Sequence, residues 1–298
     1  MKSVTLIFLF NLLIAIICHS ADPHKTYAQS DTVMVYETSI APVFDGLGND
    51  TCWQHANWQL IDQVWMPWGT TMDSSDFSGR YKIVWSASEN LLYFFIKITD
   101  DVVSDAYVPD KTAAVFNFDM FEVFIDEDRS GGYHVFDGKA SNEASLGVNA
   151  ENAYAYHIFT DIPDSGTSHT FRAEDLGGPD WDHFISKLYN DHFPNFILRR
   201  DGTINTWEFS LIVYNDMYSP ENIKSSRAIL SAGKVIGLTI AYNDDDEPEV
   251  KPTLTQRDNF IGSVAVKEAS NNDHWKNADD FGTIKLLPAG CSGNSRKN

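Results

Sequence analysis

The chain has 298 residues and a formal net charge of −20, because 22 Lys and Arg stand against 42 Asp and Glu. Its 43% hydrophobic and 13% aromatic residues are enough to build a packed core, which excludes a disordered acidic protein. The negative balance argues against binding to nucleic acid or to an acidic membrane surface, since phosphate contacts need clustered Lys and Arg. The length fits one or two domains.

The chain opens with the features of a secretory signal peptide. A single Lys precedes a mostly apolar run over 4–18, and small polar residues follow. We expect cleavage after Ser20 or after Ser30, and therefore export to the periplasm or the extracellular space. The run is too short to span a bilayer comfortably. Ile17 before Cys18 argues against a lipoprotein signal, which has a small residue at that position.

Removal of the signal peptide would leave two cysteines, Cys52 and Cys291, one near each end of the mature chain. An even pair in an oxidising compartment favours a disulfide. Closing so long a loop would stabilise the fold by roughly 4–5 kcal/mol in the chain-entropy model. The alternative is two unpaired thiols, with Cys52 buried beside Trp53. A metal site on these cysteines is not expected, because the sequence has no C-x-x-C motif.

Short runs of aromatic and β-branched residues recur along the chain, separated by Asp, Asn, Gly and Pro. Alternation over 80–85 predicts a half-buried strand, and the apolar run over 91–98 predicts a strand buried on both faces, joined to the first as a hairpin. Further strands are expected over 120–125, 153–159, 206–213, 235–242 and 282–287. No apolar stripe of helical period is sustained. The pattern predicts an all-β fold, a two-sheet antiparallel β-sandwich of the jelly-roll or immunoglobulin-like type.

Two polar stretches that contain Gly, 130–149 and 161–201, interrupt the strand pattern. We expect both to be long loop insertions on the sandwich, with a short helix near 182–190. Loops of this length in a compact domain are usually functional or mobile. Residues 288–298 have the composition of a disordered tail. Because the sequence shows no repeat and no linker, we expect one domain over 31–287.

The most informative string is FNFDMFEVFID, from Phe116 to Asp126. In a strand, alternation places Met120, Glu122 and Phe124 on one face. The Glu122 carboxylate therefore sits among apolar neighbours and needs a hydrogen-bonding partner. It is either an acceptor for the hydroxyl groups of a sugar or a structural carboxylate paired with an Arg or a backbone amide.

Acidic runs lie at three expected strand ends, 100–101, 126–128 and 244–247. Hard cations such as Ca²⁺ take six to eight oxygen ligands and suit such loops. Asp126, Asp128 and Asp244 are therefore candidate metal ligands, although none of the runs matches an EF-hand. Solvated acidic turns are the alternative.

Trp275 lies in the polar stretch NNDHW, at 271–275. An exposed ring among amides and carboxylates suits sugar binding, because the ring stacks on the C–H face of a pyranose while polar groups bind the hydroxyls. A ring that caps the edge of the core is the alternative. Trp65 and Trp68 are also expected in a loop. Three others fit core positions better: Trp53, Trp85 and Trp207.

Motifs of several enzyme classes are absent from the sequence, namely G-x-S-x-G, H-E-x-x-H and a phosphate-binding Gly loop. A pair of carboxylates for glycoside hydrolysis leaves no local mark in a sequence. Enzyme activity therefore stays open, with no particular acids indicated.

The ordered motifs from about Ile40 to Leu287 resemble carbohydrate-binding module family 9. The pieces, in chain order, are APVFDG at 41–46 with Trp53, NLLY at 90–93 with Asp100, DMFEVFID at 119–126, WEFSL at 207–211 and the 271–282 stretch with Trp275 and Phe281. Each piece is short, and their common order carries the resemblance.

The resemblance implies a β-sandwich that clamps the reducing ends of plant-polysaccharide fragments, such as xylan fragments, between two aromatic rings. By position, it assigns the rings to Phe116 and Trp275 and the hydroxyl acceptor to Glu122. Tyr156 falls where the family has its sugar-binding Arg, and Asn272 supplies an amide. The family also carries structural Ca²⁺.

Three classes of function compete at this point. The leading hypothesis is a secreted, non-catalytic sugar-binding module that acts with xylanases and related glycoside hydrolases. The second is a glycoside hydrolase built on the same sandwich, and the third is a surface sandwich whose sugar site has decayed. The expected partners are an oligosaccharide or polysaccharide and glycoside hydrolases, with no nucleic acid, and the chain is expected to be a monomer.

Overall fold

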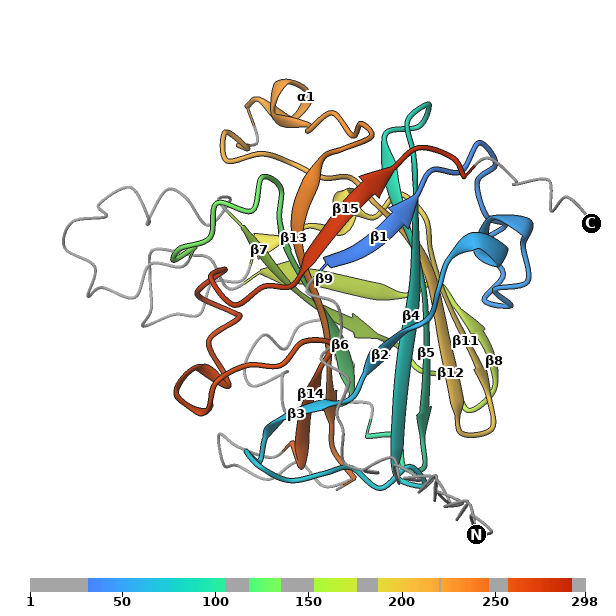
Figure 1. Ribbon diagram of the computed structural model, residues 1–298. Helices are drawn as coiled ribbons and strands as arrows, with labels where there is room; N and C mark the ends of the chain where they lie inside the picture. The colour runs from blue at the N-terminus through green and yellow to red at the C-terminus, as the bar shows by residue number, and fades with distance from the viewer. Residues whose placement is uncertain are drawn as a thin grey trace, which may run out of the picture. The chain divides into compact units, whose positions relative to one another are not determined.

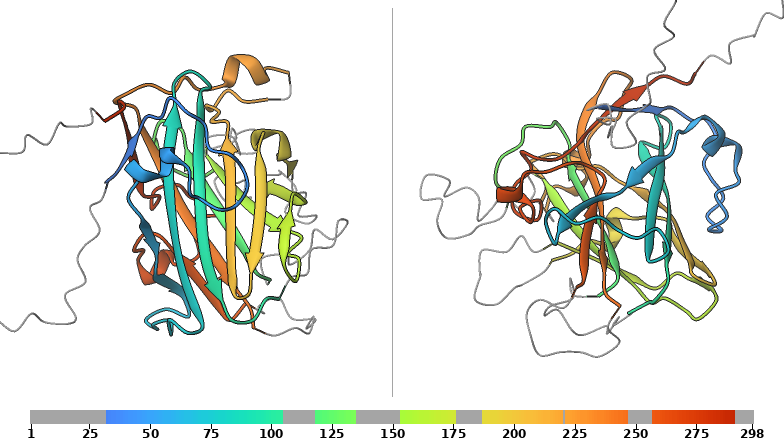
Figure 2. Two further views of the ribbon diagram at one scale, coloured as in Figure 1. Left: turned by 90° about the vertical axis from the view of Figure 1, so that its right-hand side faces the viewer. Right: turned by 60° about the horizontal axis from the view of Figure 1, so that its bottom comes forward.

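The computed structural model describes residues 32–104, 118–134, 153–175, 187–219, 221–246 and 257–290. Met1–Ser30 and Asp31–Asn298 form separate units, and the described residues all belong to the second. This unit is a β-sandwich of two sheets packed face to face, which confirms the predicted fold class (Figures 1 and 2). The predicted signal peptide lies outside the described residues.

The first sheet has nine strands and is antiparallel except for the parallel pair β1 and β15. In spatial order its strands are β1 (Thr32–Tyr36), β15 (Thr283–Leu287), β13 (Val235–Asp244), β6 (Met120–Asp126), β7 (Tyr154–Thr160), β9 (Phe171–Asp175) and β10 (Lys187–Leu188). β14 (Asn259–Gly262) also pairs with β13, and it carries β3 (Gln63–Met66) on its other side.

The second sheet has six antiparallel strands, and they face the viewer in the left panel of Figure 2. In spatial order these strands are β2 (Gln59–Ile61), β4 (Phe77–Ser86), β5 (Leu91–Asp100), β12 (Ile204–Leu211), β11 (Phe196–Asp201) and β8 (Gly166–Ser168). Helical segments in the described part are short: α1 (Ile223–Ser226) and 3-10 turns at Thr51–His55, Asn190–His192 and Glu268–Ser270. None of the described helices is long and apolar enough to cross a membrane.

Strand alternation divides the apolar residues between three clusters. The largest fills the space between the sheets and includes Phe121 and Val123 from β6. A second cluster covers the outer face of the first sheet, where Phe124 and Trp65 meet. A third, around Trp53, covers the outer face of the second sheet. The outer face of the first sheet is therefore partly closed by packed side chains, and polar groups concentrate on the remainder.

The structure corrects two of the predicted loops. The 161–201 stretch is not one long loop, since β8, β9 and β11 lie within it, and β10 stands at the end of the predicted 182–190 helix. These strands are short, and the Pro and Gly residues between them favour the prediction of a loop. Trp65, predicted to lie in a loop, belongs to β3 and is fully buried. Trp53, Trp85 and Trp207 are core residues, as predicted.

Candidate functional site

Glu122 stands on the outer face of the first sheet, at the centre of the candidate site. On β6 it is opposite His157 of β7 and Ala241 of β13. Its neighbour two positions on, Phe124, belongs to the outer cluster, whereas Phe121 and Val123 point into the core. The carboxylate is almost fully buried, so its hydrogen bonds decide whether it is tolerated there.

A chain of hydrogen bonds leads from the Glu122 carboxylate through one amide to a guanidinium and then to a second amide. Asn243 Nδ2 donates to Glu122 Oε1 at 2.6 Å, and the side-chain Oδ1 of Asn243 accepts from Arg257 Nη1 at 2.5 Å. Arg257 Nη2 donates to Asn272 Oδ1 at 3.0 Å. The guanidinium carbon lies 4.2 Å from the ring centroid of Phe260, a cation–π contact. We refer to Glu122, Asn243, Arg257 and Asn272 as the Glu122 network.

His157 faces the second oxygen of Glu122. Its Nε2 lies 3.6 Å from Glu122 Oε2, while its Nδ1 lies 2.9 Å from the carbonyl oxygen of Ala155. A separation of 3.6 Å is too long for a hydrogen bond. Within the described ranges of the chain, no side chain donates a hydrogen bond to Glu122 Oε2, which therefore keeps acceptor capacity there.

Burial and the neighbouring carboxylate act in opposite directions on the charged group of Arg257. Burial lowers the pKa of Arg257 from its usual value, and the nearby negative charge of Glu122 acts in the opposite direction. A guanidinium stays protonated in proteins. The network thus combines hydrogen-bond donors of Arg257 with the carboxylate acceptor of Glu122, linked through Asn243, which suits a ligand that both donates and accepts hydrogen bonds.

The loop that carries Asn272 and Trp275 is held down by the residue between them. His274 is buried, and its ring stacks on Trp65 with the ring centroids 4.2 Å apart. Trp65 is fixed in turn by a hydrogen bond from its Nε1 to the carbonyl oxygen of Val264 at 2.8 Å. Trp275 is half-buried against the same outer cluster. The loop therefore has a packed inner side, whereas Trp275 is only partly buried and has Lys276 Nζ 5.7 Å from its ring centroid.

Three of the predicted ligand-binding residues thus lie on the outer face of the first sheet. Glu122 and Asn272 belong to one network, and Trp275 follows Asn272 on the same loop. Phe116, predicted as the other aromatic ring, lies outside the described residues.

Tyr156 does not reach the site. In the strand register it is opposite Val123, so its side chain points into the core, where its hydroxyl lies 2.6 Å from His192 Nδ1. The residue that β7 places beside Glu122 is its neighbour His157. The expectation for Tyr156 fails by one residue, because a shift of one position along a strand reverses the face.

Three residues of the candidate site are not among those predicted from the sequence: Asn243, His157 and Arg257. For Asn243 a signal existed, because it continues the alternation of the 235–242 strand on the face of Ala241. Arg257 follows a polar stretch and precedes β14, so no local pattern marks it. Its guanidinium supplies the positive charge that the Tyr156 position lacks.

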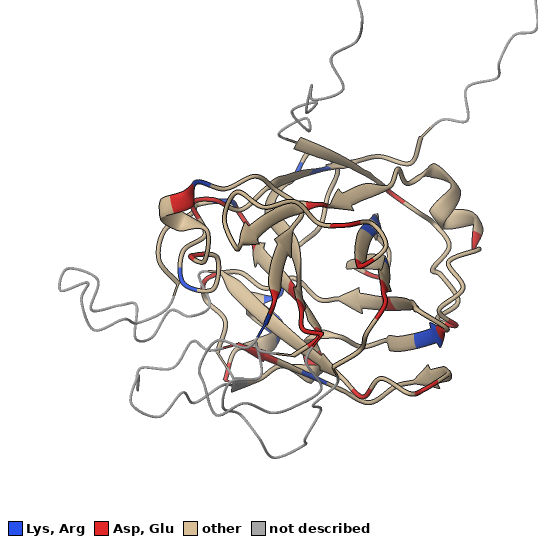
Figure 3. Cartoon of the chain, turned by 90° about the horizontal axis from the view of Figure 1, so that it is seen from below, with Lys and Arg blue, Asp and Glu red and all other residues tan. Residues whose placement is uncertain are grey.

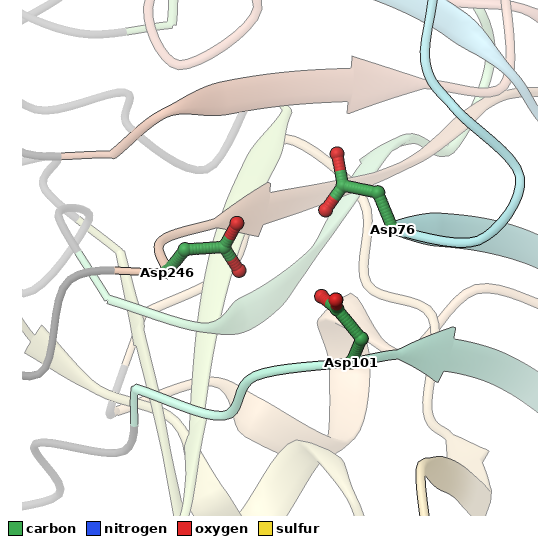
Figure 4. Close-up of side chains that lie close together, drawn as sticks. All are labelled: Asp76, Asp101 and Asp246. Atoms are coloured by element: carbon green, nitrogen blue, oxygen red, sulfur yellow. The ribbon is translucent and has the colours of Figure 1, made fainter.

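The candidate metal ligands separate into different places. Asp244 groups with Asp100 and Asp246, and Asp246 also groups with Asp76 and Asp101. Figure 3 shows acidic positions on several segments seen from below, and in Figure 4 the carboxylates of Asp76, Asp101 and Asp246 converge.

Asp128 and Asp126 belong to another part of the fold. Asp128 groups with Glu127 and Asp216. Asp126 accepts hydrogen bonds from the backbone N–H groups of Gly131 at 2.8 Å and Asp128 at 3.3 Å. Asp126 therefore closes the turn after β6 and is in none of the described groups that could hold a metal.

Comparison with known proteins places this chain in a family. The model of the carbohydrate family 9 binding domain-like family matches residues 44–288, and the chain belongs to that family. No curated protein sequence matches the chain.

Two solved structures of a carbohydrate binding module family 9 from Caldicellulosiruptor kristjanssonii are similar to the chain in fold. The complex with cellotriose has 15% identity and a TM-score of 0.52, and the alignment covers 90% of this chain and 99% of that one. The complex with glucose has 16% identity and a TM-score of 0.52, and the alignment covers 89% of this chain and 100% of that one.

Proposed function

We propose that the chain is a carbohydrate-binding module whose binding site is the Glu122 network together with Trp275. The observation that carries the proposal is the Arg257 guanidinium, which joins two amide oxygens near a buried carboxylate on the outer face of the first sheet. Sugar hydroxyls both donate and accept hydrogen bonds, so they match a site that offers Glu122 as acceptor and Arg257 as donor. The partly accessible ring of Trp275 adds a surface for the C–H face of a pyranose.

The energies of these contacts fit a binding module of ordinary affinity. A hydrogen bond to a charged group contributes about 1.5–3 kcal/mol. Stacking on an aromatic ring contributes roughly 1–3 kcal/mol, by analogy with base–aromatic stacking. Association itself costs several kcal/mol, so micromolar to millimolar dissociation constants are expected.

The proposal also covers the ligand, the export of the protein and the enzymes that it acts with. We expect binding to the reducing end of plant-polysaccharide fragments, with Phe116 as the second ring, as the family resemblance implies. The solved relatives hold cellotriose and glucose, which makes cello-oligosaccharides the first ligands to test, with xylo-oligosaccharides beside them. The apolar run over 4–18 supports export, and action alongside polysaccharide-degrading hydrolases follows from the same resemblance.

Isothermal titration calorimetry with cellotriose and xylotriose tests the proposal. Glu122→Gln should weaken binding at least tenfold, because the amide cannot accept charge-assisted hydrogen bonds, and Trp275→Ala should abolish measurable heat. Glu221→Gln is the matched control, since Glu221 is an exposed carboxylate outside the network. Equal binding of native and borohydride-reduced oligosaccharides would contradict reducing-end recognition. Wild-type affinity in both Glu122→Gln and Trp275→Ala would overturn the site.

A further inference from the structure

Positive charge gathers on the outer face of the second sheet, although the chain as a whole has a net charge of −20. Arg80 and Lys82 of β4 and Lys97 of β5 alternate with residues of the core, so all three side chains leave the sheet on its outer side. In the strand register Arg80 is directly opposite Lys97. We call these three cations, with Trp58 beside them, the basic patch.

The basic patch is open to solvent. In the left panel of Figure 2 the N-terminal segment, in blue, crosses the upper part of the second sheet and leaves the lower part in view. Arg80 is exposed, and Lys82 and Lys97 are half-buried. Leu60, which is opposite Arg80 on the edge strand β2, is 51% exposed. A ligand can therefore reach the patch from the edge of the sheet.

Trp58 orders two of the three cations. The guanidinium carbon of Arg80 lies 4.4 Å from the centroid of the Trp58 ring, and Lys82 Nζ lies 5.0 Å from it. Trp58 packs in turn against Phe95, with the ring centroids 5.6 Å apart. Lys82 Nζ also donates to the backbone carbonyl oxygen of Trp53 at 2.7 Å. The charged groups are thus held in place before a ligand binds, which lowers the entropic cost of binding.

The charges of the basic patch are unbalanced in the part of the chain that the structure describes. None of the three cations forms an ion pair with a described residue. Glu208, an acid on the same face, is buried and accepts hydrogen bonds from Gly46 N and Trp53 Nε1. Like charges directly opposite each other on neighbouring strands are destabilising, and burial together with the charge of Arg80 lowers the pKa of Lys82. An arrangement that costs stability in this way indicates an external anion that balances the charges.

A fourth cation continues the patch across the strands. Lys97 is opposite Thr206 of β12, and Thr206 is opposite Arg199 of β11. Neighbouring strands lie about 4.8 Å apart, so Arg199 follows Lys97 at about twice that spacing. The Thr206 hydroxyl donates to the carbonyl oxygen of Gly46 at 2.7 Å, so the tip of the N-terminal segment lies between these two cations. The cations form a row, and a row suits an anion whose charge repeats.

We propose that the basic patch binds an acidic polysaccharide, a chain of sugar units that carry carboxylate groups as uronic acids do. Guanidinium and ammonium groups bind carboxylates by charge-assisted hydrogen bonds. Each exposed ion pair is weak by itself, and the repeated carboxylates of one chain supply the affinity. The site lies on the other sheet from the Glu122 network, and it does not rest on the proposed function.

A nucleic acid matches the basic patch less well than a polyuronate does. Its phosphates extend far beyond three or four cations, and they would meet the surplus carboxylates on the rest of a protein with a net charge of −20. A polyuronate carries one carboxylate on each sugar ring and is the less densely charged of the two polymers.

Calorimetry with oligogalacturonate tests the site, in a buffer with EDTA so that no divalent cation bridges the sugar to acidic residues. The fully methyl-esterified oligomer, which keeps the rings and loses the charge, should bind at least tenfold more weakly. Lys97→Glu should abolish measurable binding, because the new carboxylate pairs with Arg80. It should melt no lower than the wild type, because a like-charge pair is removed. Lys285→Gln, at an exposed lysine of the first sheet, is the control and should bind as wild type.

Salt and a neutral competitor distinguish the two sites. Added sodium chloride should weaken oligogalacturonate binding at least tenfold, because salt screens surface charges, and saturating cellotriose should leave it unchanged. Displacement by cellotriose, equal binding of the esterified oligomer, or wild-type binding by Lys97→Glu would overturn the basic patch as the site. Tighter binding of single-stranded DNA or of phosphatidylserine vesicles would overturn the choice of a polysaccharide. Oligogalacturonate binding without any cellotriose binding would overturn the proposed function and leave the basic patch supported.

Discussion

Arg257 is the residue on which the candidate site depends most. It donates to the side-chain oxygens of both Asn243 and Asn272, and so connects β13 to the loop that carries Trp275. A single guanidinium holds both because its N–H groups diverge in one plane, a geometry that an ammonium group cannot reproduce.

Arg257→Lys is therefore expected to weaken cellotriose binding by at least tenfold while the charge is kept. The fold should survive, because the lysine stem can still pack over Phe260. Calorimetry measures the affinity, and thermal melting reports the fold. Arg80→Lys, on the second sheet, is the control and should bind as wild type. Equal affinity of Arg257→Lys and wild type would show that the simultaneous hydrogen bonds from Arg257 to Asn243 and Asn272 are not required.

His192 gives a pH prediction at the same scale. Burial lowers the pKa of its imidazole to about 3, whereas an unfolded histidine has a pKa of about 6.5. Below about pH 6.5 the unfolded chain therefore binds a proton that the native protein does not, and the free energy of unfolding falls as the pH drops towards 3. Two further buried histidines add to this effect: His134, with its pKa lowered to about 4, and His274, lowered to about 3.

Urea unfolding at pH 7, 6 and 5 measures this dependence. His192→Gln keeps a hydrogen-bonding group for the Tyr156 hydroxyl but cannot take up a proton in this range. Its free energy of unfolding should therefore fall less steeply with decreasing pH than that of the wild type. Parallel curves for the two proteins would assign the pH dependence to other groups.

At the scale of elements, the contact between β14 and β3 positions the Trp275 loop. A Cβ atom at Gly262 would lie 1.9 Å from the Trp65 ring, so the close approach of the two strands requires glycine. Trp65 also stacks on His274, and its carbonyl oxygen accepts a hydrogen bond from Asn271 Nδ2 at 3.0 Å. Displacement of Trp65 would therefore reach the loop.

Gly262→Ala is expected to destabilise the protein by about 1–3 kcal/mol, the usual cost of overpacking, and to weaken sugar binding several-fold. Gly290→Ala is the control, because a Cβ atom there meets only Tyr36, at an ordinary distance of 3.9 Å. Chemical denaturation and calorimetry of both variants separate the two effects. Unchanged stability of Gly262→Ala would mean that Trp65 shifts without resistance.

Elements with a strong local pattern could be predicted from the sequence, and elements fixed by distant partners could not. The hairpin of β4 and β5 and the facing of Glu122 on β6 follow from alternation alone. β8 has three residues and pairs with β11 across a long connection, so it was expected to be loop. β11 instead forms a tight hairpin with β12, with Asp201 opposite Ile204, and the Asp-Gly pair at 201–202 was a local signal for it. At the site, Glu122, Asn272 and Trp275 lie in recognisable motifs, whereas Arg257 reaches the network only because β14 folds back onto β13.

At the scale of the whole molecule, the predicted Cys52–Cys291 disulfide stays a prediction. Cys52 is buried and carries a free thiol in the described part of the chain, and Cys291 lies outside that part. Mass spectrometry of the unreduced protein should find a peptide pair that contains both residues. Two alkylated thiols after unfolding without reductant would contradict the disulfide. In that case the native Cys52 thiol should resist alkylation, because burial raises its pKa to about 11.

The parallel pairing of β1 with β15 has a mechanical consequence. Thr32 is opposite Thr283 and Tyr36 is opposite Leu287, so tension applied to the two chain ends pulls the strands lengthwise past each other. Hydrogen bonds loaded in this direction must break together, whereas those of a hairpin pulled from its open end break one by one. A module stretched between two attachments should therefore resist extension until this pair ruptures in one step. Single-molecule pulling from residues 31 and 290 should show one high force peak, and pulling from residues 36 and 290 should lower it.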